Sequence, residues 1–454
     1  MANPRCHVIV IPYPAQGHIN PLLQFAKRLA SKGVKATLAT TPYTINSIHA
    51  PTVGVEPISD GFDEGGFKQS SGVEAYLESF KAVGSRTLSE LILKFNASDS
   101  PVRCIVYDSL LTWPVDVARQ FGIYAAVFLT NSASVCSMYW QIDQGLLNLP
   151  VEQETVPVSL PGLPSLGFQE LPSFLASPTT QSAYLAAILE KFHSLDKNDW
   201  VFCNSFEELE IQLVGAMRGL WPVVMVGPMV PSAYLDQQID GDTAYGASLW
   251  EPTTDQCLRW LDMKPPDSVI YVSFGSMADI SAKQVEEMAW GLEASKRPFL
   301  WVIKDSENKL PDDFISSIGE TGIVVAWCNQ LEVLAHQAVG CFVTHCGWNS
   351  TLEGLSLGVP MVCVTQWSDQ PTNAKFVEEV WKVGVRAEKD EEGIVRRKEL
   401  EKCIREVMVG ERSGEMKNNA SKWRDLAKVA VRLGGSSDTN VDQFVVKLLD
   451  EKKT

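Results

Sequence analysis

The stretch that decides the fold is WCNQLEVLAHQAVGCFVTHCGWNSTLEGLSLGVPMVCVTQWSDQ, residues 327–370. Within it an apolar, β-branched run ends at His345, turns through Gly347 and continues into a helical pattern opened by Asn349 and Ser350. A second apolar run, VPMVCV, follows, so the pattern predicts a strand–helix–strand unit of a parallel sheet. The start of such a helix presents free backbone N–H groups and a positive dipole end, which favour an anion.

The same alternation of strand-like and helical segments runs through the rest of the chain. Most of the strand-like runs are apolar on both faces, as buried parallel strands are. A helix is expected at residues 20–32, with Asn20 as its N-cap and Pro21 at its first position. The predicted strands lie at residues 6–13, 35–41, 104–108, 124–129, 200–204, 223–227, 268–274, 299–303, 322–327, 340–345 and 359–364. The fold class is therefore α/β, with doubly wound parallel sheets.

Two βα-rich halves are separated by a polar stretch containing glycine, proline and aspartate between residues 226 and 251. We predict four segments: an N-terminal domain at 1–235, a linker at 236–252, a C-terminal domain at 253–435, and a last helical segment at 436–454 that packs back on the N-terminal domain. Doubly wound domains bind ligands at the carboxyl ends of their strands. A ligand is therefore expected in a cleft between the two domains.

Composition limits the class of protein. The 454 residues are 45% hydrophobic and 21% charged, which excludes disorder and coiled coil as the main architecture. The formal charge of -16 offers no basic face, so nucleic acid is not an expected partner. No apolar run approaches the length of a membrane span. The ten cysteines are scattered without a C-x-x-C pair, which predicts reduced thiols and a cytoplasmic enzyme.

Nucleotide motifs of the common kinds are missing, because the chain has neither a G-x-G triplet nor a Gly-Lys pair. The helix that opens at Asn349 instead suits a diphosphate. Glu353 lies one helical turn further on, where its carboxylate can accept hydrogen bonds from vicinal ribose hydroxyls. Trp327 offers a flat face for a base, and Asp369 and Gln370 offer polar groups for sugar hydroxyls.

Residues 327–370 resemble the signature box of the plant secondary-product glycosyltransferases, which are UDP-sugar-dependent family-1 enzymes of the two-domain GT-B fold. Six motifs fall in register with that box: WC-Q, VL-H, THCGWNS, E, GVPM and DQ. The resemblance extends along the chain through PAQGHINP (14–21), YDS (107–109) and VSFGS (272–276). The resemblance implies UDP-glucose as co-substrate. The residues that it assigns to the donor are Trp327 on uracil, Gln330 and Glu353 on the ribose, His345, Asn349, Ser350 and Ser276 on the diphosphate, and Trp348, Asp369, Gln370 and Thr130 on the sugar. Cys328 and Gly347 complete the predicted donor-binding residues.

His18 and Asp108 are the candidate catalytic pair. His18 follows the first predicted strand and Asp108 ends another, so both side chains are expected at the same edge of the sheet. An aspartate bonded to one imidazole nitrogen fixes the tautomer, and the other nitrogen then takes the proton of an acceptor hydroxyl. The resemblance implies a single displacement with inversion and no metal.

The acceptor is expected to be a hydrophobic small molecule bound to a monomer. A proline-rich zone at 149–178 and the residues Tyr76, Asn131 and Tyr184 are the candidate acceptor-pocket positions. Overall similarity to triterpenoid glucosyltransferases of the mogrol type favours a triterpenoid, with a flavonoid or another phenolic as the next choice.

Two alternative functions stay open. The pentapeptide GLSLG at 354–358 matches the nucleophile elbow of serine esterases with Ser356 as nucleophile, although an elbow requires a strand before it and a helix after it. A catalytically silent binder of nucleotide sugars is the other alternative, and the presence of His18 and Asp108 argues against it. Asp240-Gly241-Asp242 matches a metal-binding Asp-x-Asp pair, but its polar surroundings indicate a solvated loop.

Overall fold

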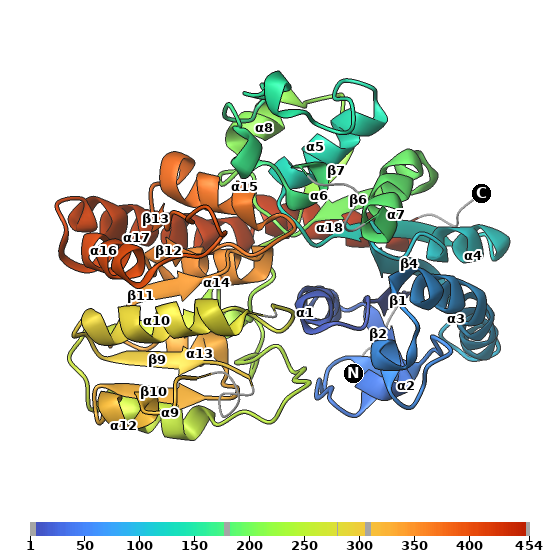
Figure 1. Cartoon of the computed structure of the whole chain (residues 1–454). Coiled ribbons are helices and arrows are strands. Elements are labelled where there is room, and N and C mark those ends of the chain that lie inside the picture. Colours follow the sequence, from blue (N-terminus) through green and yellow to red (C-terminus); the bar gives the residue numbers. More distant parts are fainter. Residues whose placement is uncertain (1–5, 177–181, 279, 305–309, 451–454) are drawn as a thin grey trace. The chain divides into compact units, whose positions relative to one another are not determined.

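Two parallel sheets organise the chain, and the computed structural model describes residues 6–176, 182–278, 280–304 and 310–450 (Figure 1). The first compact unit contains the described residues up to Ser165, Phe174–Leu249 and those from Val429 onward. The second contains Leu166–Ser173 and Trp250–Lys428. Each unit is a doubly wound α/β domain, which confirms the predicted fold class.

The sheet of the first unit has seven strands in the order β3-β2-β1-β4-β5-β6-β7. Its strands are β1 His7–Ile11, β2 Lys35–Thr40, β3 Gly54–Pro57, β4 Val102–Asp108, β5 Tyr124–Leu129, β6 Trp200–Cys203 and β7 Val223–Met225. Its helices are α1 Gln16–Ser31, α2 Pro42–Ile45, α3 Val73–Asn96, α4 Pro114–Gln120, α5 Ala133–Asp143, α6 Ser173–Ala176, α7 Ser182–His193, α8 Ile211–Ala216 and α18 Ser436–Asp450. The strand order reverses between β1 and β4, and such a switch point is where open α/β sheets bind ligands.

The sheet of the second unit has six strands in the order β10-β9-β8-β11-β12-β13, so its switch point lies between β8 and β11. Its strands are β8 Val269–Ser273, β9 Phe299–Val302, β10 Gly322–Val325, β11 Val339–Thr344, β12 Met361–Cys363 and β13 Gly384–Arg386. Its helices are α9 Thr254–Asp262, α10 Ala282–Ala294, α12 Phe314–Ile318, α13 Gln330–Leu334, α14 Trp348–Leu357, α15 Gln370–Lys375, α16 Arg397–Val409 and α17 Ser413–Val431, whose last residues belong to the first unit.

Every predicted strand is present, and two further strands, β3 and β13, were not predicted. Both are short edge strands, GVEP and GVR, with too few apolar residues to stand out in the sequence. The central strands β1 and β8 are buried at every position, because helices cover both faces of each sheet. This burial explains why the apolar runs of the central strands were informative, whereas β3 and β13 were not recognised.

The predicted start of the first helix was wrong. Helix α1 begins at Gln16 with Ala15 as its N-cap, five residues before the expected N-cap Asn20. The carbonyl of Ala15 accepts hydrogen bonds from the N–H groups of His18 and Ile19, which completes a turn ahead of Pro21. Proline removes one helical hydrogen bond, and the buried face of the helix offsets that loss. His18 therefore lies in the first turn of α1 rather than in a loop before it.

The segment after β7 packs into the first unit over much of the predicted linker. Asp242 is buried, and its carboxylate accepts hydrogen bonds from Lys27 Nζ at 2.8 Å and Gln24 Nε2 at 2.6 Å. Asp236 pairs with Arg28 at 2.9 Å. The interpretation of Asp240-Gly241-Asp242 as a solvated loop was therefore wrong for Asp242, because the buried cations of α1 require counter-charges. The chain leaves the first unit only after Leu249.

The last helix, α18, packs on the first sheet. In Figure 1 it lies beside β6 and β7, and Phe444 contacts Trp200 and Phe202 with ring centroids 4.8 Å and 5.0 Å away. The hydroxyl of Ser437 donates to the carbonyl of Gly227 at 2.6 Å. The described part of the predicted 436–454 segment thus belongs to the core of the first unit, and residues 451–454 lie outside the described residues.

Candidate active site

His345 lies at the switch point of the second sheet, directly after β11. Two glycines flank its imidazole, one after the neighbouring strand β8 and one in its own loop: a Cβ added to Gly275 would lie 2.9 Å from the ring, and one added to Gly347 would lie 2.5 Å from it. Only glycine permits this approach, and Gly275 also has a φ of +69°. Burial lowers the pKa of His345 to about 4, so the ring is neutral at pH 7. Its Nδ1 is buried and has no hydrogen-bond partner among the described residues.

Helix α14 begins beside this imidazole. Its N-cap is Gly347, which has no side chain to cap the first N–H groups. Unpaired N–H groups and the dipole at a helix start favour an anion. Asn349 is half-buried in this first turn, whereas Trp348 is only 3% exposed and packs against Trp381.

A buried set of side chains lies one turn further along α14. Gln330 Nε2 donates to Glu353 Oε2 at 2.5 Å and to Ser350 Oγ at 2.9 Å. The hydroxyl of Tyr271, on β8, donates to Gln330 Oε1 at 3.1 Å. Glu353 is 4% exposed. The structure therefore brings the two predicted ribose residues together, and Tyr271 is a partner that sequence reasoning missed.

Trp327 lies in a small aromatic and cationic cluster. Its ring centroid is 4.7 Å from that of Trp250, and Lys304 Nζ lies 3.8 Å from the Trp250 ring. Lys304 also donates to the backbone carbonyl of Ser276. Lys304 follows β9 at the carboxyl edge of the sheet. Its position after a predicted strand is the feature of the sequence from which it could have been named as a candidate.

Cys328, the residue after Trp327, lies inside the second unit. It is buried, and the hydroxyl of Tyr271 lies 3.6 Å from its Sγ. A hydrogen bond with Cys257 and burial together raise the pKa of the Cys328 thiol. It is thus a packing residue of this region.

The loop from Gln366 to Gln370 is closed by the side chain of its last residue. Gln370 Oε1 accepts from the N–H of Gln366 at 2.7 Å and from the N–H of Trp367 at 3.1 Å. The carboxylate of Asp369 is oriented by Asn373, whose Nδ2 donates to it at 2.8 Å. The side-chain oxygen of Gln370 is therefore engaged in the loop, and its side-chain nitrogen, Nε2, is the candidate donor to a ligand.

In the first unit, His18 and Asp108 meet at the switch point between β1 and β4. His18 Nδ1 lies 2.7 Å from Asp108 Oδ2, and the side chains are 20% and 0% exposed. The other carboxylate oxygen of Asp108 accepts from the N–H of Leu110 at 2.9 Å. Thr130 Oγ1 lies 3.3 Å from the same imidazole nitrogen. Since Nδ1 faces the carboxylate, it carries the proton, and Nε2 is left as a proton acceptor.

The predicted acceptor residue Tyr76 lies beside Tyr13, which sequence reasoning missed although it lies two residues after the end of β1. The rings of His18 and Tyr76 lie 5.4 Å and 6.0 Å from the ring of Tyr13. Tyr76 is fully buried and its hydroxyl donates to Asp60 Oδ2 at 2.6 Å. Tyr184 is half-buried against Phe174.

Asn131, the third predicted acceptor residue, follows β5. Its backbone carbonyl accepts from Cys203 Sγ at 3.5 Å, and the residue is half-buried. The proline-rich zone contains a short helix at Phe168–Glu170 and helix α6, and its residues 177 and 178 lie outside the described residues.

Ser356 does not form a nucleophile elbow. It lies in the last turns of α14 and is fully buried, and Gly358 is the C-cap of that helix. An elbow requires an exposed serine between a strand and a helix, so this geometry contradicts the esterase alternative.

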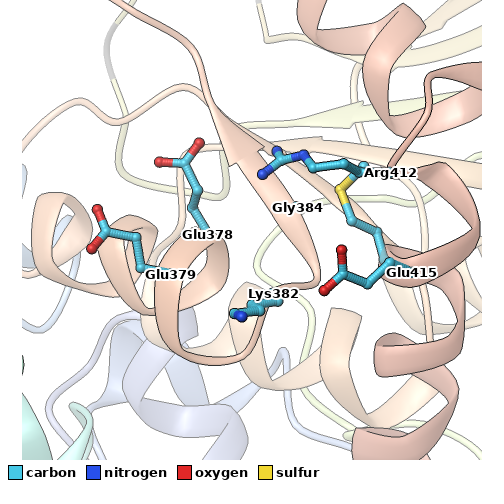
Figure 2. A pocket seen from close by; sticks show the side chains of 7 residues that line it. Glu378, Glu379, Lys382, Gly384, Arg412 and Glu415 are labelled. Atoms are coloured by element: carbon cyan, nitrogen blue, oxygen red, sulfur yellow. The ribbon is translucent and has the colours of Figure 1, made fainter.

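A cavity of about 370 Å³ lies elsewhere on the second unit (Figure 2). It is lined by Glu378, Glu379, Lys382, Gly384, Arg412, Glu415 and Met416. Figure 2 shows Glu378 and Glu379 on one side and Arg412 and Glu415 on the other. None of the predicted site residues lines it. Across the described ranges, no group of three or more potential metal ligands is assembled and no helix has the length and apolarity to cross a bilayer.

Comparison with known proteins identifies the family. Residues 220–426 match the family described as UDP-glucoronosyl and UDP-glucosyl transferase, and residues 5–58 match the glycosyltransferase N-terminal domain. UDP-glycosyltransferase 74B1 of Arabidopsis thaliana is 49% identical, with 97% of each chain covered. Mogroside I-E synthase of Siraitia grosvenorii is 43% identical, with 97% of this chain and 98% of that protein covered.

Solved structures agree with these relatives. Os79 from O. sativa in complex with UDP has a TM-score of 0.93 and 40% identity, covering 97% of this chain and 100% of that one. A second structure of Os79, with a TM-score of 0.90 and 39% identity over 97% of this chain and 100% of that one, is a complex with U2F and trichothecene. The two Rossmann-like sheets are those of the GT-B fold. With UDP in the relative's structure and 43–49% identity to plant enzymes over nearly the whole length, the chain belongs to the plant family-1 UDP-glycosyltransferases.

Proposed function

We propose that this enzyme is an inverting, UDP-glucose-dependent O-glucosyltransferase that acts on a hydrophobic small molecule. The observation that carries the proposal is the 2.7 Å contact between His18 Nδ1 and the fully buried Asp108 carboxylate. An imidazole oriented in this way is a general base for an acceptor hydroxyl.

The donor binds to the side chains that surround the start of α14. Trp327 stacks on uracil, and Gln330 and Glu353 hold the ribose, whose hydroxyls donate hydrogen bonds to the carboxylate of Glu353. The diphosphate lies against the uncapped N-terminus of α14, with His345, Asn349 and Ser276 around it. Ser350 acts through Gln330, to which it is hydrogen-bonded at 2.9 Å. Asp369 and the amide nitrogen of Gln370 bind the glucose hydroxyls.

The reaction follows from the position of the free imidazole nitrogen. Nε2 of His18 takes the acceptor proton, and the acceptor oxygen forms a bond to the anomeric carbon as the bond from that carbon to the diphosphate oxygen breaks. Asp108 stabilises the imidazolium. The helix dipole and the N–H groups of α14 stabilise the charge that develops on UDP. Attack opposite to UDP converts an α-linked donor into a β-glucoside, and no step requires a metal.

Thr130 contacts His18, the proposed general base. Its hydroxyl oxygen lies 3.3 Å from His18 Nδ1, so we assign it to orienting the imidazole in addition to the predicted sugar contact.

The acceptor site is aromatic. Tyr13 provides an aromatic face beside His18, Tyr184 a second aromatic ring and Asn131 a polar group, whereas the fully buried Tyr76 packs against Tyr13 in a supporting position. This supports a large apolar acceptor, a triterpenoid first and a flavonoid or other phenolic second. The names of relatives fit this range, since one is a mogroside synthase and another a flavonol 7-O-beta-glucosyltransferase.

The compartment that we propose is the cytoplasm, and the state a monomer. All ten cysteines are free and buried, as expected of a protein from a reducing compartment.

The test is turnover of UDP-glucose with a panel of triterpenoid, flavonol and phenolic acceptors. We expect a glucoside whose anomeric proton shows the β configuration by NMR. An α-glucoside would contradict the single displacement. Binding of UDP without any turnover across the panel would favour the silent-binder alternative.

A further inference from the structure

A segment from the first half of the sequence is built into the second unit. Leu166–Ser173 belongs to that unit, although the residues on either side belong to the first. Its contacts concentrate on two neighbouring elements, the loop that ends at Asp369 and helix α15, which begins at Gln370.

Ser173 and Ser368 form two reciprocal hydrogen bonds. The N–H of Ser173 donates to the carbonyl of Ser368 at 2.8 Å, and the N–H of Ser368 donates to Ser173 Oγ at 2.7 Å. Ser368 has a φ of +62°, in the left-handed region that favours glycine. A serine keeps that conformation only when its surroundings fix it. The two bonds from Ser173 supply such a constraint immediately before Asp369.

Glu170 holds helix α15 from the same segment. Its carbonyl accepts from Thr372 Oγ1 at 2.7 Å, and its carboxylate pairs with Lys375 Nζ at 2.9 Å. The same carboxylate pairs with Arg386, on β13, at 2.6 Å. Glu378 and Glu379 complete the ion pairs of Arg386, so they face this network as well as the cavity in Figure 2. The segment is therefore fixed to both sides of the Asp369–Gln370 pair.

We infer that Ser173 and Glu170 are positioning residues that set the geometry of the sugar-reading pair, Asp369 and Gln370, and thereby the choice of donor sugar. The inference rests on the proposed function, since it presumes a hexose on those two residues. Hydrogen bonds to sugar hydroxyls are sensitive to small displacements. A displacement that breaks such a bond leaves a buried polar group unpaired, and this costs the full desolvation free energy of that group. UDP lacks the hexose that is transferred, so its binding does not depend on this geometry.

The experiment compares three variants with the unaltered protein. Ser173→Ala removes the acceptor of the Ser368 N–H, Thr372→Val removes the bond to Glu170 from the other side, and Ser173→Thr restores a hydroxyl. Gln169→Ala is the matched control, because Gln169 is exposed on the same segment. The measurements are KM and kcat with UDP-glucose and with its epimer UDP-galactose, and the Kd of UDP.

We expect Ser173→Ala and Thr372→Val to raise the KM of UDP-glucose by about three- to tenfold and to reduce the glucose-to-galactose ratio of kcat/KM by a similar factor. The Kd of UDP should stay within about twofold, the range of a neutral substitution. Ser173→Thr should recover most of the selectivity, and Gln169→Ala should match the unaltered protein.

Unchanged KM and selectivity in both variants would overturn the inference. A parallel loss of UDP affinity would also overturn it, because the segment would then merely stabilise the second unit. Failure of the proposed function looks different: the unaltered protein itself would show no transfer from UDP-glucose, and the positioning role would fall with it.

Discussion

At the scale of single residues, the side chains that we propose for the donor site already hold one another in place. Glu353, Gln330 and Tyr271 already form a hydrogen-bonded chain, and Asn373 already orients Asp369. Preorganised polar groups cost little to reorganise on binding, which favours affinity. His345 differs, since its buried Nδ1 has no partner among the described residues. A ligand oxygen at this point would satisfy it.

Replacement of Glu353 by alanine should weaken UDP binding by roughly 1–3 kcal/mol, because buried ribose hydroxyls lose their acceptor. Isothermal titration calorimetry with UDP measures the change. Glu320→Ala, an exposed glutamate of the same unit, is the control and should leave the affinity unchanged. Equal affinities for the two variants would remove Glu353 from the donor site.

Replacement of His18 by alanine should lower kcat by about 10² to 10⁴, the usual contribution of general-base catalysis, with UDP affinity nearly unchanged. His49→Ala is the control, because His49 is an exposed histidine of the same unit. Steady-state kinetics with a saturating acceptor provides the comparison. Near-normal turnover of His18→Ala would rule out the base.

At the scale of elements, the loop after β8 approaches the imidazole of His345 closely, and this contact can be tested. Gly275→Ala should reduce UDP affinity about tenfold or more, since its Cβ would lie 2.9 Å from the imidazole. Gly393→Ala is a matched control, with a φ of +76° but no atom within 4 Å of the added Cβ. Both variants bear left-handed strain of about 1 kcal/mol, but only the first displaces His345. If the two lose UDP affinity equally, backbone strain alone explains the effect.

The sequence predicted elements best where burial imposes a pattern. The central strands were all found, because two covered faces require continuous apolar runs. The edge strands β3 and β13 were missed for lack of that requirement. The start of α1 was misplaced because Asn20 and Pro21 are typical of a helix start, whereas the carbonyl of Ala15 begins the helix earlier.

Site residues followed the same division. Candidate side chains inside a contiguous motif, such as Asn349 and Glu353, could be proposed from local spacing. Tyr13, Lys304 and Ser173 were missed, because their relevance depends on contacts with residues distant in the sequence. For Ser173 the partner is 195 positions away, and no local pattern encodes such a contact.

At the scale of the whole molecule, stability should fall below neutral pH. Burial lowers the pKa of both His7 and His345 to about 4, from an ordinary value of 6.5. Between these values the unfolded chain binds protons that the folded chain does not. The free energy of unfolding is therefore complete above pH 6.5 and falls toward pH 4, by roughly 3 kcal/mol for each histidine.

Urea denaturation across this pH range tests whether protonation of His7 lowers the free energy of unfolding. His7→Gln should flatten the dependence, while His193→Gln, whose side chain is 87% exposed in the native protein, should not. An unchanged slope in His7→Gln would show that other groups carry the acid sensitivity.

The measurement that tests the central claim most directly is calorimetric titration of the whole protein with UDP in the presence of EDTA, with Glu353→Ala as the reference variant. The account predicts micromolar binding of UDP to one site without metal, weakened in the variant by about ten- to a hundredfold. Absence of binding, or binding that EDTA abolishes, would contradict the uridine-diphosphate site around α14.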